Sequence, residues 1–422
     1  MESDEESYAC AAVIVAAALI EEEEQENQKR KRVWSREWLK KRNTHGSYAT
    51  LYKELSTDEQ LFQKYLHIPF PIYEFILERI KSKIEKEDTH FRVPIAAGAR
   101  LEATLLFLVT GQSYSRLQYL NRIEKSTLGK IIPEVCDAIY SVLGNEYIKT
   151  PTTKEEWQFI AEEFKIRWQF PNCLGALDGK HVAISPPSNS GSYYFNYKGT
   201  HSVVLMAVAN ANYEIVYADV GANGRVSDGG VWANCSLNRI FQNETANIPD
   251  PRALPNSNKV LPFVLIGDDA FPLRKNLMKP FPHRQQNNEQ RVFSYRLSRA
   301  RRVVENAFGI MANRFGILRT TINLEPKKVE KIIFAIITLH NLLRKLAPNE
   351  YTPGGTFDSE NVETGEMQPG SWRSSPASSM LPIASSQARN SSDEAKNIRL
   401  QYMNYFNNDG AVTWQLRMAG LD

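Results

Sequence analysis

The stretch CLGALDGKHVAI, residues 173–184, decides the fold, because it is apolar on both sides of a single carboxylate, Asp178. Such a run is typical of a buried β-strand. A carboxylate inside it costs folding energy unless it has a partner or binds a metal ion. For Asp178 taken alone, an Asp-Gly turn at a strand end is the structural alternative.

The segments that follow continue this pattern, with short runs of strand periodicity and longer runs of helical periodicity. We expect strands at 201–209, 213–220 and 261–266, and helices at 229–241, 296–318 and 329–343. Three consecutive strands that can form a meander, then a helix, a strand and further helices, predict an α/β domain over residues 151–348. This order fits the ribonuclease-H-like fold, a mixed sheet flanked by helices.

Two further carboxylates are candidate site residues. Asp268 ends the apolar strand, at the edge of a sheet where ligand sites collect. The adjacent Asp269 is the substitute candidate if Asp268 is not the ligand. Capping the N-terminus of a helix is the structural alternative for Asp269. Glu305 lies in an apolar and basic helix, where a salt bridge to Arg301 is the alternative role.

Asp178, Asp268 and Glu305 come from two strands and a helix that a ribonuclease-H-like sheet would bring together. Three converging carboxylates need cations to offset their repulsion. Oxygen ligands favour Mg²⁺ or Mn²⁺. Two such ions would activate a water or a 3′-hydroxyl for attack on a phosphodiester.

Charge is informative only locally, since the net charge of +3 is ordinary. Residues 270–345 carry sixteen Lys and Arg against four Glu and no Asp. This balance predicts binding of a polyanion, with an exposed helical face as the alternative. The candidate contacts are Arg296, Arg299 and Arg302 and, in a Gly-rich turn after the third strand, Arg225.

Residues 48–150 have helical periodicity, interrupted by Thr110-Gly111-Gln112-Ser113. Helix, glycine turn and helix make the outline of a helix-turn-helix, which any small helical bundle also has. Arg116, Lys125 and Lys130 follow the turn and are candidate phosphate contacts. The region is therefore predicted to be a helix-turn-helix-like DNA-binding domain, with a plain bundle as the alternative.

The outer segments differ in composition. Residues 1–47 form a charged tail, in which Lys29–Arg32 fits a nuclear-import signal, a phosphate-contacting arm or a solvated helix. Residues 349–392 are rich in Pro, Gly and Ser and are expected to be a disordered linker, and residues 393–422 a docking segment. The apolar run 11–20 is about half the length needed to cross a bilayer, so no membrane association is expected.

Tyrosine, histidine and cysteine residues also bear on the site. Tyr193, Tyr194 and Tyr197 fit a hairpin whose rings cover a sheet or stack on unpaired bases, and the first is favoured. His181 and His201 have no Ser or Cys partner nearby and are interpreted as structural. The four scattered Cys form no zinc or disulfide spacing and are expected to be reduced thiols.

Four blocks carry a family resemblance: GALDGKHV, GRVSDGGVW, IGDDAFPL and RRVVENAFGIMANRFGIL, in this order. They resemble the Asp-Asp-Glu domain of the PIF/Harbinger transposases and the Harbinger transposase-derived nucleases, over about residues 34–345. The resemblance implies a metal-dependent nuclease that acts on DNA in the nucleus. Asp178, Asp268 and Glu305 fall on the family's three carboxylates, although a small residue is usual where Asp269 stands.

These observations predict a metal-dependent DNA endonuclease of transposon origin. The alternatives are a domesticated DNA-binding or chromatin-associated protein that does not cleave, and an RNA-cleaving enzyme on the same fold. DNA is the expected partner, together with the Myb-like DNA-binding protein that accompanies the family and a second copy of the chain in a homo-oligomer. The nucleus is the expected location, with the cytoplasm as the alternative.

Overall fold

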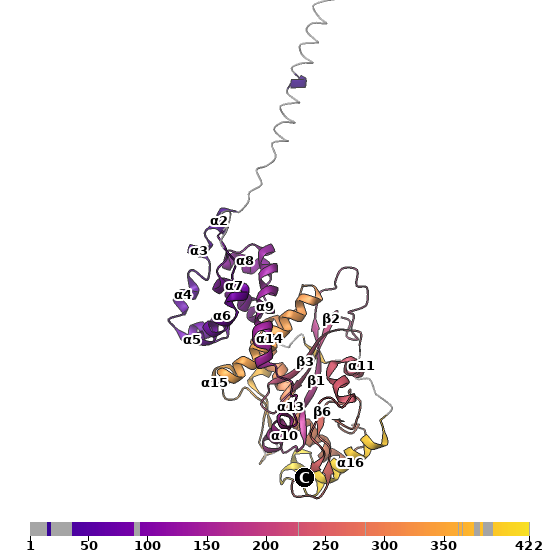
Figure 1. The fold of residues 1–422 in the computed structure, drawn as a ribbon. Coiled ribbons are helices and arrows are strands. Elements are labelled where there is room, and N and C mark those ends of the chain that lie inside the picture. Colours follow the sequence, from indigo (N-terminus) through magenta and orange to yellow (C-terminus); the bar gives the residue numbers. More distant parts are fainter. Residues whose placement is uncertain are drawn as a thin grey trace, which may run out of the picture.

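The computed structural model describes residues 15–17, 36–87 and 93–421, apart from 227, 283, 362, 365, 375–379 and 383–390. Helices fill the described residues up to Trp168, and a mixed sheet flanked by helices follows (Figure 1). The α/β prediction is confirmed. No helix in this part of the chain is both long and apolar enough to span a membrane. Lys29–Arg32 lies outside the described residues.

The central sheet has the strand order β3-β2-β1-β6-β7, and β10 also pairs with β1. The strands are β1 (Cys173–Ala183), β2 (Ser202–Ala209), β3 (Ile215–Asn223), β6 (Val264–Ile266), β7 (Leu277–Met278) and β10 (Leu381–Pro382). The first three form the expected antiparallel meander, and β6 runs parallel to β1. The mixed sheet therefore places β6, which leads to Asp268, directly beside the strand that carries Asp178.

The expected strand at 261–266 is interrupted, because Pro262 has no backbone N–H to donate to a neighbouring strand. Its first residues form β5 (Val260–Leu261), which pairs with β4 (Arg252–Ala253) in a separate two-stranded sheet. Only Val264–Ile266 joins the main sheet as β6. The break shortens the strand but leaves Asp268 two residues beyond its end.

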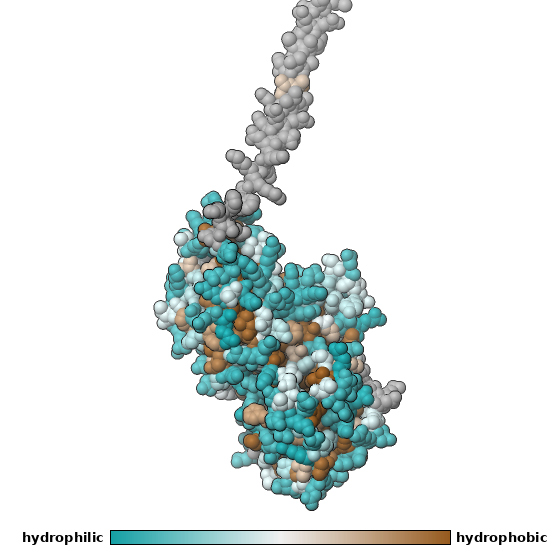
Figure 2. Space-filling model, viewed as in Figure 1, coloured by the Kyte–Doolittle hydropathy of each residue, from teal (hydrophilic) through white to brown (hydrophobic). Residues whose placement is uncertain are grey.

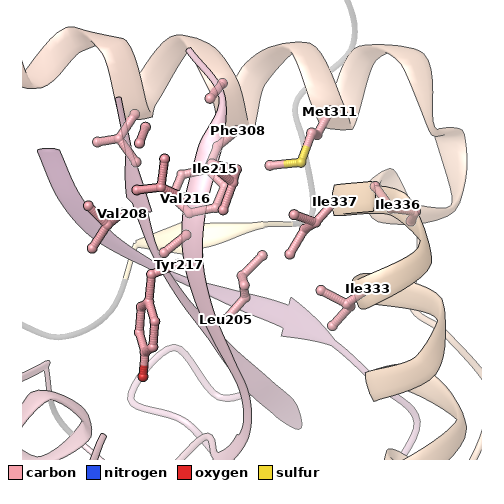
Figure 3. Packing of buried hydrophobic residues seen from close by; sticks show 14 of the residues in the cluster. Leu205, Val208, Ile215, Val216, Tyr217, Phe308, Met311, Ile333, Ile336 and Ile337 are labelled. Carbon is pink, nitrogen blue, oxygen red and sulfur yellow. The ribbon is translucent and has the colours of Figure 1, made fainter. Parts of the chain in front are cut away.

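Helices cover both faces of the sheet (Figure 1). The helices α13 (Asn288–Arg314) and α14 (Pro326–Leu346) pack on one face, with Phe308, Met311 and Ile337 turned toward the strands (Figure 3). The helices α11 (Asp228–Asn234) and α12 (Ser236–Gln242) lie on the other face. There the Tyr217 hydroxyl bonds Ser236 Oγ at 2.8 Å. The expected helix at 229–241 divides because Cys235 caps the second half.

The N-terminal part is a bundle of helices that shares its core with the sheet domain. Its helices are α2 (Glu37–Lys40), α3 (Arg42–His45), α4 (Leu51–Leu55), α5 (Glu59–Leu66), α6 (Phe70–Ile84), α7 (Ala97–Thr110), α8 (Tyr114–Asn121) and α9 (Lys125–Tyr147). The next helix, α10 (Lys154–Trp168), packs on β1 and belongs to the α/β part. The helix α9 packs on α14, with Tyr140 stacked on Phe334 at 4.6 Å between ring centroids. Figure 2 shows the face in view as mainly hydrophilic, with small separate apolar patches. The large apolar side chains are thus mostly used inside this joint core.

Gly111 makes the turn between α7 and α8. Its φ of +65° is left-handed, which favours glycine. A Cβ there would lie 3.0 Å from the carbonyl oxygen of Gly316, in the short helix η1 (Gly316–Arg319). The glycine therefore serves both the turn and the close approach of the bundle to the α/β part.

A buried carboxylate, Glu102 of α7, joins three parts of the bundle. It accepts hydrogen bonds from Ser47 Oγ at 3.0 Å, the Tyr65 hydroxyl at 2.8 Å and Asn121 Nδ2 at 3.3 Å. Burial raises the pKa of Glu102 to about 7, although the three donors lower it. The folded protein therefore holds this proton to a higher pH than the unfolded chain does.

We expect the free energy of unfolding to fall as the pH rises from about 4.5 to about 7. In this window the unfolded chain has released the Glu102 proton and the folded chain still holds it. The full effect is about 3 kcal/mol. In denaturant titrations between pH 5 and pH 8, Glu102→Gln should flatten the slope, and Glu59→Gln, at an exposed position of α5, should not. An unchanged slope in Glu102→Gln would contradict the raised pKa.

The C-terminal segment returns to the α/β part. Its described elements are α15 (Pro348–Tyr351), β8 (Ser359–Glu360), β9 (Met367–Gln368), η2 (Ser371–Ser374), α16 (Asp393–Asn407) and α17 (Gln415–Met418). In α16, Tyr402 donates a hydrogen bond to the Pro262 carbonyl at 2.9 Å, and Phe406 packs on Phe170. The segment therefore packs against β5 and α13.

The prediction of a disordered linker over 349–392 is wrong for the described residues of 352–374, all but 362 and 365, which we call the strap. The strap lies along α13 and is held by specific contacts. Phe357 stacks on Tyr213 with 4.0 Å between ring centroids. Asp358 accepts two hydrogen bonds from Arg373, at 2.8 and 2.6 Å. Trp372 Nε1 donates to Asn306 Oδ1 at 2.8 Å. A few long-range contacts thus order a segment that is poor in large apolar residues.

Candidate active site

The register between β1 and β6 brings two aspartates together. Ala176 pairs with Ile266 in parallel, and Asp178 and Asp268 each lie two residues farther along. Side chains two residues apart point to the same face of a strand, and paired strands lie about 4.8 Å apart. Asp178 is 3% exposed. Burial and then the charge of Asp178 raise the pKa of Asp268 to about 6, so the two carboxylates repel each other.

Asp269, the alternative to Asp268, is oriented differently. It is exposed, whereas Asp268 is half-buried and accepts a hydrogen bond from the backbone of Ala270 at 3.0 Å. The Asp269 carbonyl accepts a hydrogen bond from Lys279 Nζ at 2.9 Å. Because neighbouring residues of an extended chain face opposite ways, the geometry favours Asp268 as the partner of Asp178.

Glu305 reaches the same place from α13. This helix begins with a capping box formed by Asn287 and Gln290, and its apolar side faces the core. The Glu305 carboxylate forms an ion pair with Arg301, and the other end of that guanidinium lies 4.0 Å from Asp178 Oδ1. Arg301 therefore bridges the glutamate of the helix and the aspartate of the strand.

Arg301 is the cation of this cluster. Burial alone would lower its pKa, but the carboxylates of Glu305, Asp178, Asp268 and Asp269 outweigh burial and raise the pKa above its ordinary value. Glu305 contributes most, in line with their direct contact. In this structure the guanidinium offsets the charges that a metal ion would otherwise offset.

Lys180 is a second cation at the site. Its Nζ lies 2.7 Å from Asp178 Oδ2 and 5.6 Å from the centroid of the Phe308 ring. The angle between the Lys180 Nζ atom and the carboxylate does not suit a hydrogen bond. The buried Asp178 Oδ2 atom therefore has an ion pair but no hydrogen bond within the described part of the chain. Lys180 could have been found from the sequence, since residues 178 and 180 face the same side of a strand.

The donor set fits a divalent cation. Among the described residues, no group of three or more His, Cys, Asp and Glu side chains is already arranged to hold a metal ion. The carboxylates nevertheless offer only oxygen, two of them repel each other, and one buried oxygen lacks a hydrogen bond. These are properties that Mg²⁺ or Mn²⁺ would satisfy. Glu305 would have to exchange Arg301 for the ion.

Arg296, expected to contact DNA, is instead part of the interior. It is 2% exposed, and burial lowers its pKa to about 10. It donates hydrogen bonds to the carbonyls of Gln169 and Gly410 and to Gln415 Oε1, and its guanidinium lies over the Phe406 ring. The expectation of a DNA contact is wrong for this residue, because the C-terminal segment covers it.

Arg299 and Arg302 are paired within the chain. Arg299 Nε lies 2.7 Å from Glu360 Oε2, and Arg302 forms an ion pair with the other oxygen of Glu360. The Glu360 side chain is only 6% exposed. Both arginines thus hold the strap, and neither offers a free surface to DNA in this conformation. Glu360 escaped the sequence analysis because the segment around it was expected to be disordered.

The other predicted nucleic-acid contacts lie at the surface. Arg116, Lys125 and Lys130 are exposed on α8 and α9, and Arg225 is exposed in the turn after β3. Each offers a cation to solvent.

His181, interpreted as structural, is 1% exposed, and burial lowers its pKa to about 4. Cys136, Cys173 and Cys235 are buried free thiols.

A known protein family matches this part of the chain. Residues 177–341 match the family described as DDE superfamily endonuclease. The matched range contains Asp178, Asp268 and Glu305, and it ends inside α14. No solved structure matches the chain significantly.

Curated relatives come from an animal and a plant. The rat (Rattus norvegicus) protein HARBI1, whose name calls it a nuclease, is 23% identical over 289 residues, covering 68% of this chain and 78% of the relative. The "Protein ALP1-like" of Arabidopsis thaliana is 22% identical over 296 residues, covering 68% of this chain and 71% of the relative. The Arabidopsis protein named "antagonist of like heterochromatin protein 1" is 21% identical over 238 residues, covering 56% and 59%.

Proposed function

Because the chain belongs to the Harbinger transposase-derived family that carries the DDE superfamily endonuclease domain, we propose that it is a divalent-metal-dependent DNA endonuclease. Asp178, Asp268 and Glu305 would hold Mg²⁺ or Mn²⁺, most simply two ions. The observation that carries the proposal is the parallel register of β1 and β6, with Asp178 and Asp268 side by side and Glu305 linked to Asp178 through Arg301.

The strand order supports a ribonuclease-H-like fold for residues 151–348, because an antiparallel meander is followed by strands parallel to the first. When bound, the metal ions would activate a water molecule or a 3′-hydroxyl of the DNA and stabilise the leaving oxygen of the phosphodiester. The chain's own residues orient the site. Lys180 forms an ion pair with Asp178, and α13 supplies Glu305 next to them.

Substrate binding is proposed for the exposed cations. Arg116, Lys125, Lys130 and Arg225 would contact phosphates, with α7, the turn at Gly111 and α8 as the helix-turn-helix and α9 following it. A Myb-like partner protein and a second copy of this chain are proposed to contribute further DNA contacts. The proposed cleavage of DNA would take place in the nucleus.

The test is nicking of supercoiled plasmid by the purified full chain. We expect relaxed circles with Mg²⁺ or Mn²⁺ and none with EDTA. A binding measurement on the same plasmid decides the meaning of a negative result. DNA binding without nicking, also in the presence of the Myb-like partner, would favour a non-cleaving chromatin-associated protein, a role that the name of the third relative supports.

A further inference from the structure

The connection between β1 and β2 exposes three aromatic rings. Tyr193 is 57%, Phe195 44% and Tyr197 54% exposed. These residues lie in turns beyond the end of β1. The expected sheet cover holds in part, because Tyr194 packs against the core and Tyr197 against His181 of β1. Figure 1 shows this connection extending past the end of the sheet. We call the three residues the ring loop.

Each exposed ring is braced by a second ring. Tyr193 meets Tyr194 edge-on, with 5.0 Å between centroids. Phe195 meets His201 in the same way at 5.3 Å, and Tyr197 lies 6.0 Å from His181. The Tyr197 hydroxyl also donates a hydrogen bond to the Pro382 carbonyl at 3.0 Å. The rings are therefore held in position while much of their surface stays open to solvent.

The backbone of the ring loop is held by one buried side chain, Asn196, which is 3% exposed. Its Oδ1 accepts hydrogen bonds from the backbone N–H groups of Lys198 and Thr200, at 3.0 and 3.1 Å. Its Nδ2 donates to Thr200 Oγ1 and to Ser202 Oγ. A loop fixed in this way loses little conformational entropy when a ligand binds.

Cations stand beside the rings. Lys198 Nζ lies 5.6 Å from the centroid of the Tyr197 ring. Arg225 is exposed next to Gly224, where an added Cβ would come within 2.5 Å of the Tyr194 carbonyl oxygen, so the two turns touch. Open aromatic rings with flanking positive charge suit a flat ligand that carries negative charge, such as a nucleotide.

The ring loop adjoins β1, the strand that carries Asp178. Tyr197 contacts His181, which is three residues from Asp178 on β1. At about 3.3 Å per residue, this separation is about 10 Å along the strand, or roughly three nucleotides of a DNA strand. His181 faces the opposite side of β1 from Asp178. The rings would therefore meet DNA beyond the cut rather than the reacting phosphate.

We propose that Tyr193, Phe195 and Tyr197 form a stacking surface for unpaired bases of DNA near the cut. The proposal rests on the proposed endonuclease function. In duplex DNA the base faces are hidden by stacking, so the rings would act on single-stranded ends or on bases turned out of the helix. Stacking on an aromatic side chain contributes about 1–3 kcal/mol per base.

The test measures binding without cutting, in the full chain carrying Asp178→Asn. A duplex with a short single-stranded overhang that contains 2-aminopurine is compared with the matching blunt duplex. Combined replacement of Tyr193, Phe195 and Tyr197 by Leu should weaken binding of the overhang duplex at least about 10-fold. The 2-aminopurine quenching should be lost and the affinity for the blunt duplex should stay unchanged. Phe159→Leu, 68% exposed on α10, is the matched control and should change nothing.

Other outcomes separate the two proposals. Equal weakening for both duplexes would mean a general backbone contact and would overturn stacking. Unchanged binding and quenching in the triple variant would also overturn it, and would leave the rings as a contact for a protein partner. Failure of the parent protein to bind either duplex, with or without the Myb-like partner, would instead count against the endonuclease function. Thermal melting of each variant checks that the fold is retained.

Discussion

Asp178→Asn is expected to lower the rate of DNA cleavage on the order of 1,000-fold or more. Asparagine has nearly the shape of aspartate but lacks the negative charge that would hold a metal ion. The buried Asp178 Oδ2 atom, without a hydrogen bond in the described part of the chain, is the donor that the ion would lose. The measurement is the initial rate of plasmid nicking in Mn²⁺, with DNA affinity determined in parallel.

The matched control is Asp269→Asn, one residue from Asp268. Asp269 is exposed, so its replacement should leave the nicking rate within a few-fold of the parent. Asp268→Asn should behave like Asp178→Asn. Full activity of Asp268→Asn together with an inactive Asp269→Asn would show that Asp269, and not Asp268, is the partner of Asp178. Retained cleavage in Asp178→Asn would rule out the carboxylate cluster as the catalytic centre.

Arg301→Met is expected to destabilise the metal-free protein by about 3 kcal/mol and to strengthen its response to Mn²⁺. Removal of the guanidinium leaves several carboxylates with one less cation to offset them. Methionine keeps much of the length of the side chain and suits a helix. The free energy of unfolding in EDTA, and the rise of the melting temperature on adding Mn²⁺, test both parts of the prediction without any cleavage assay.

Arg302→Met provides the comparison within the same helix. Arg302 pairs with Glu360 of the strap, so its loss should also lower stability. It should not enlarge the Mn²⁺-induced rise in melting temperature. Two results would show that Arg301 does not stand in for the metal ion: an equal Mn²⁺-induced rise in melting temperature in both variants, or a rise no larger than that of the parent in either.

The strands and main helices could be predicted because their apolar periodicity is strong. Asp178 and Asp268 stood out for the same reason, as single carboxylates inside or just after apolar runs. Their register needed the structure, since the pairing of Ala176 with Ile266 depends on long-range contacts. The structure was also needed to place Arg301 beside Asp178. An i,i+4 pair with Glu305 looks the same in sequence whether or not the arginine also reaches Asp178.

The basic stretch before Glu305 shows why charge in a sequence can mislead. Arg296, Arg299 and Arg302 form a run typical of an exposed surface. In the fold they face Glu360 and the backbone of segments that lie far away along the chain. No local pattern announces such partners. The strap was missed for the related reason that Asp358, Phe357 and Trp372 order it through isolated contacts instead of a repeating pattern.

The cover over Arg296 also has a consequence for the timing of biosynthesis. One acceptor of its guanidinium, Gln415, lies 119 residues later in the chain. Ribosomes add about 5–20 residues per second, so roughly 6–24 s separate the synthesis of the two. During this interval Arg296 of α13 lacks the two acceptors that the C-terminal segment supplies, Gly410 and Gln415. The cover of this buried guanidinium is therefore completed only after translation has passed residue 415.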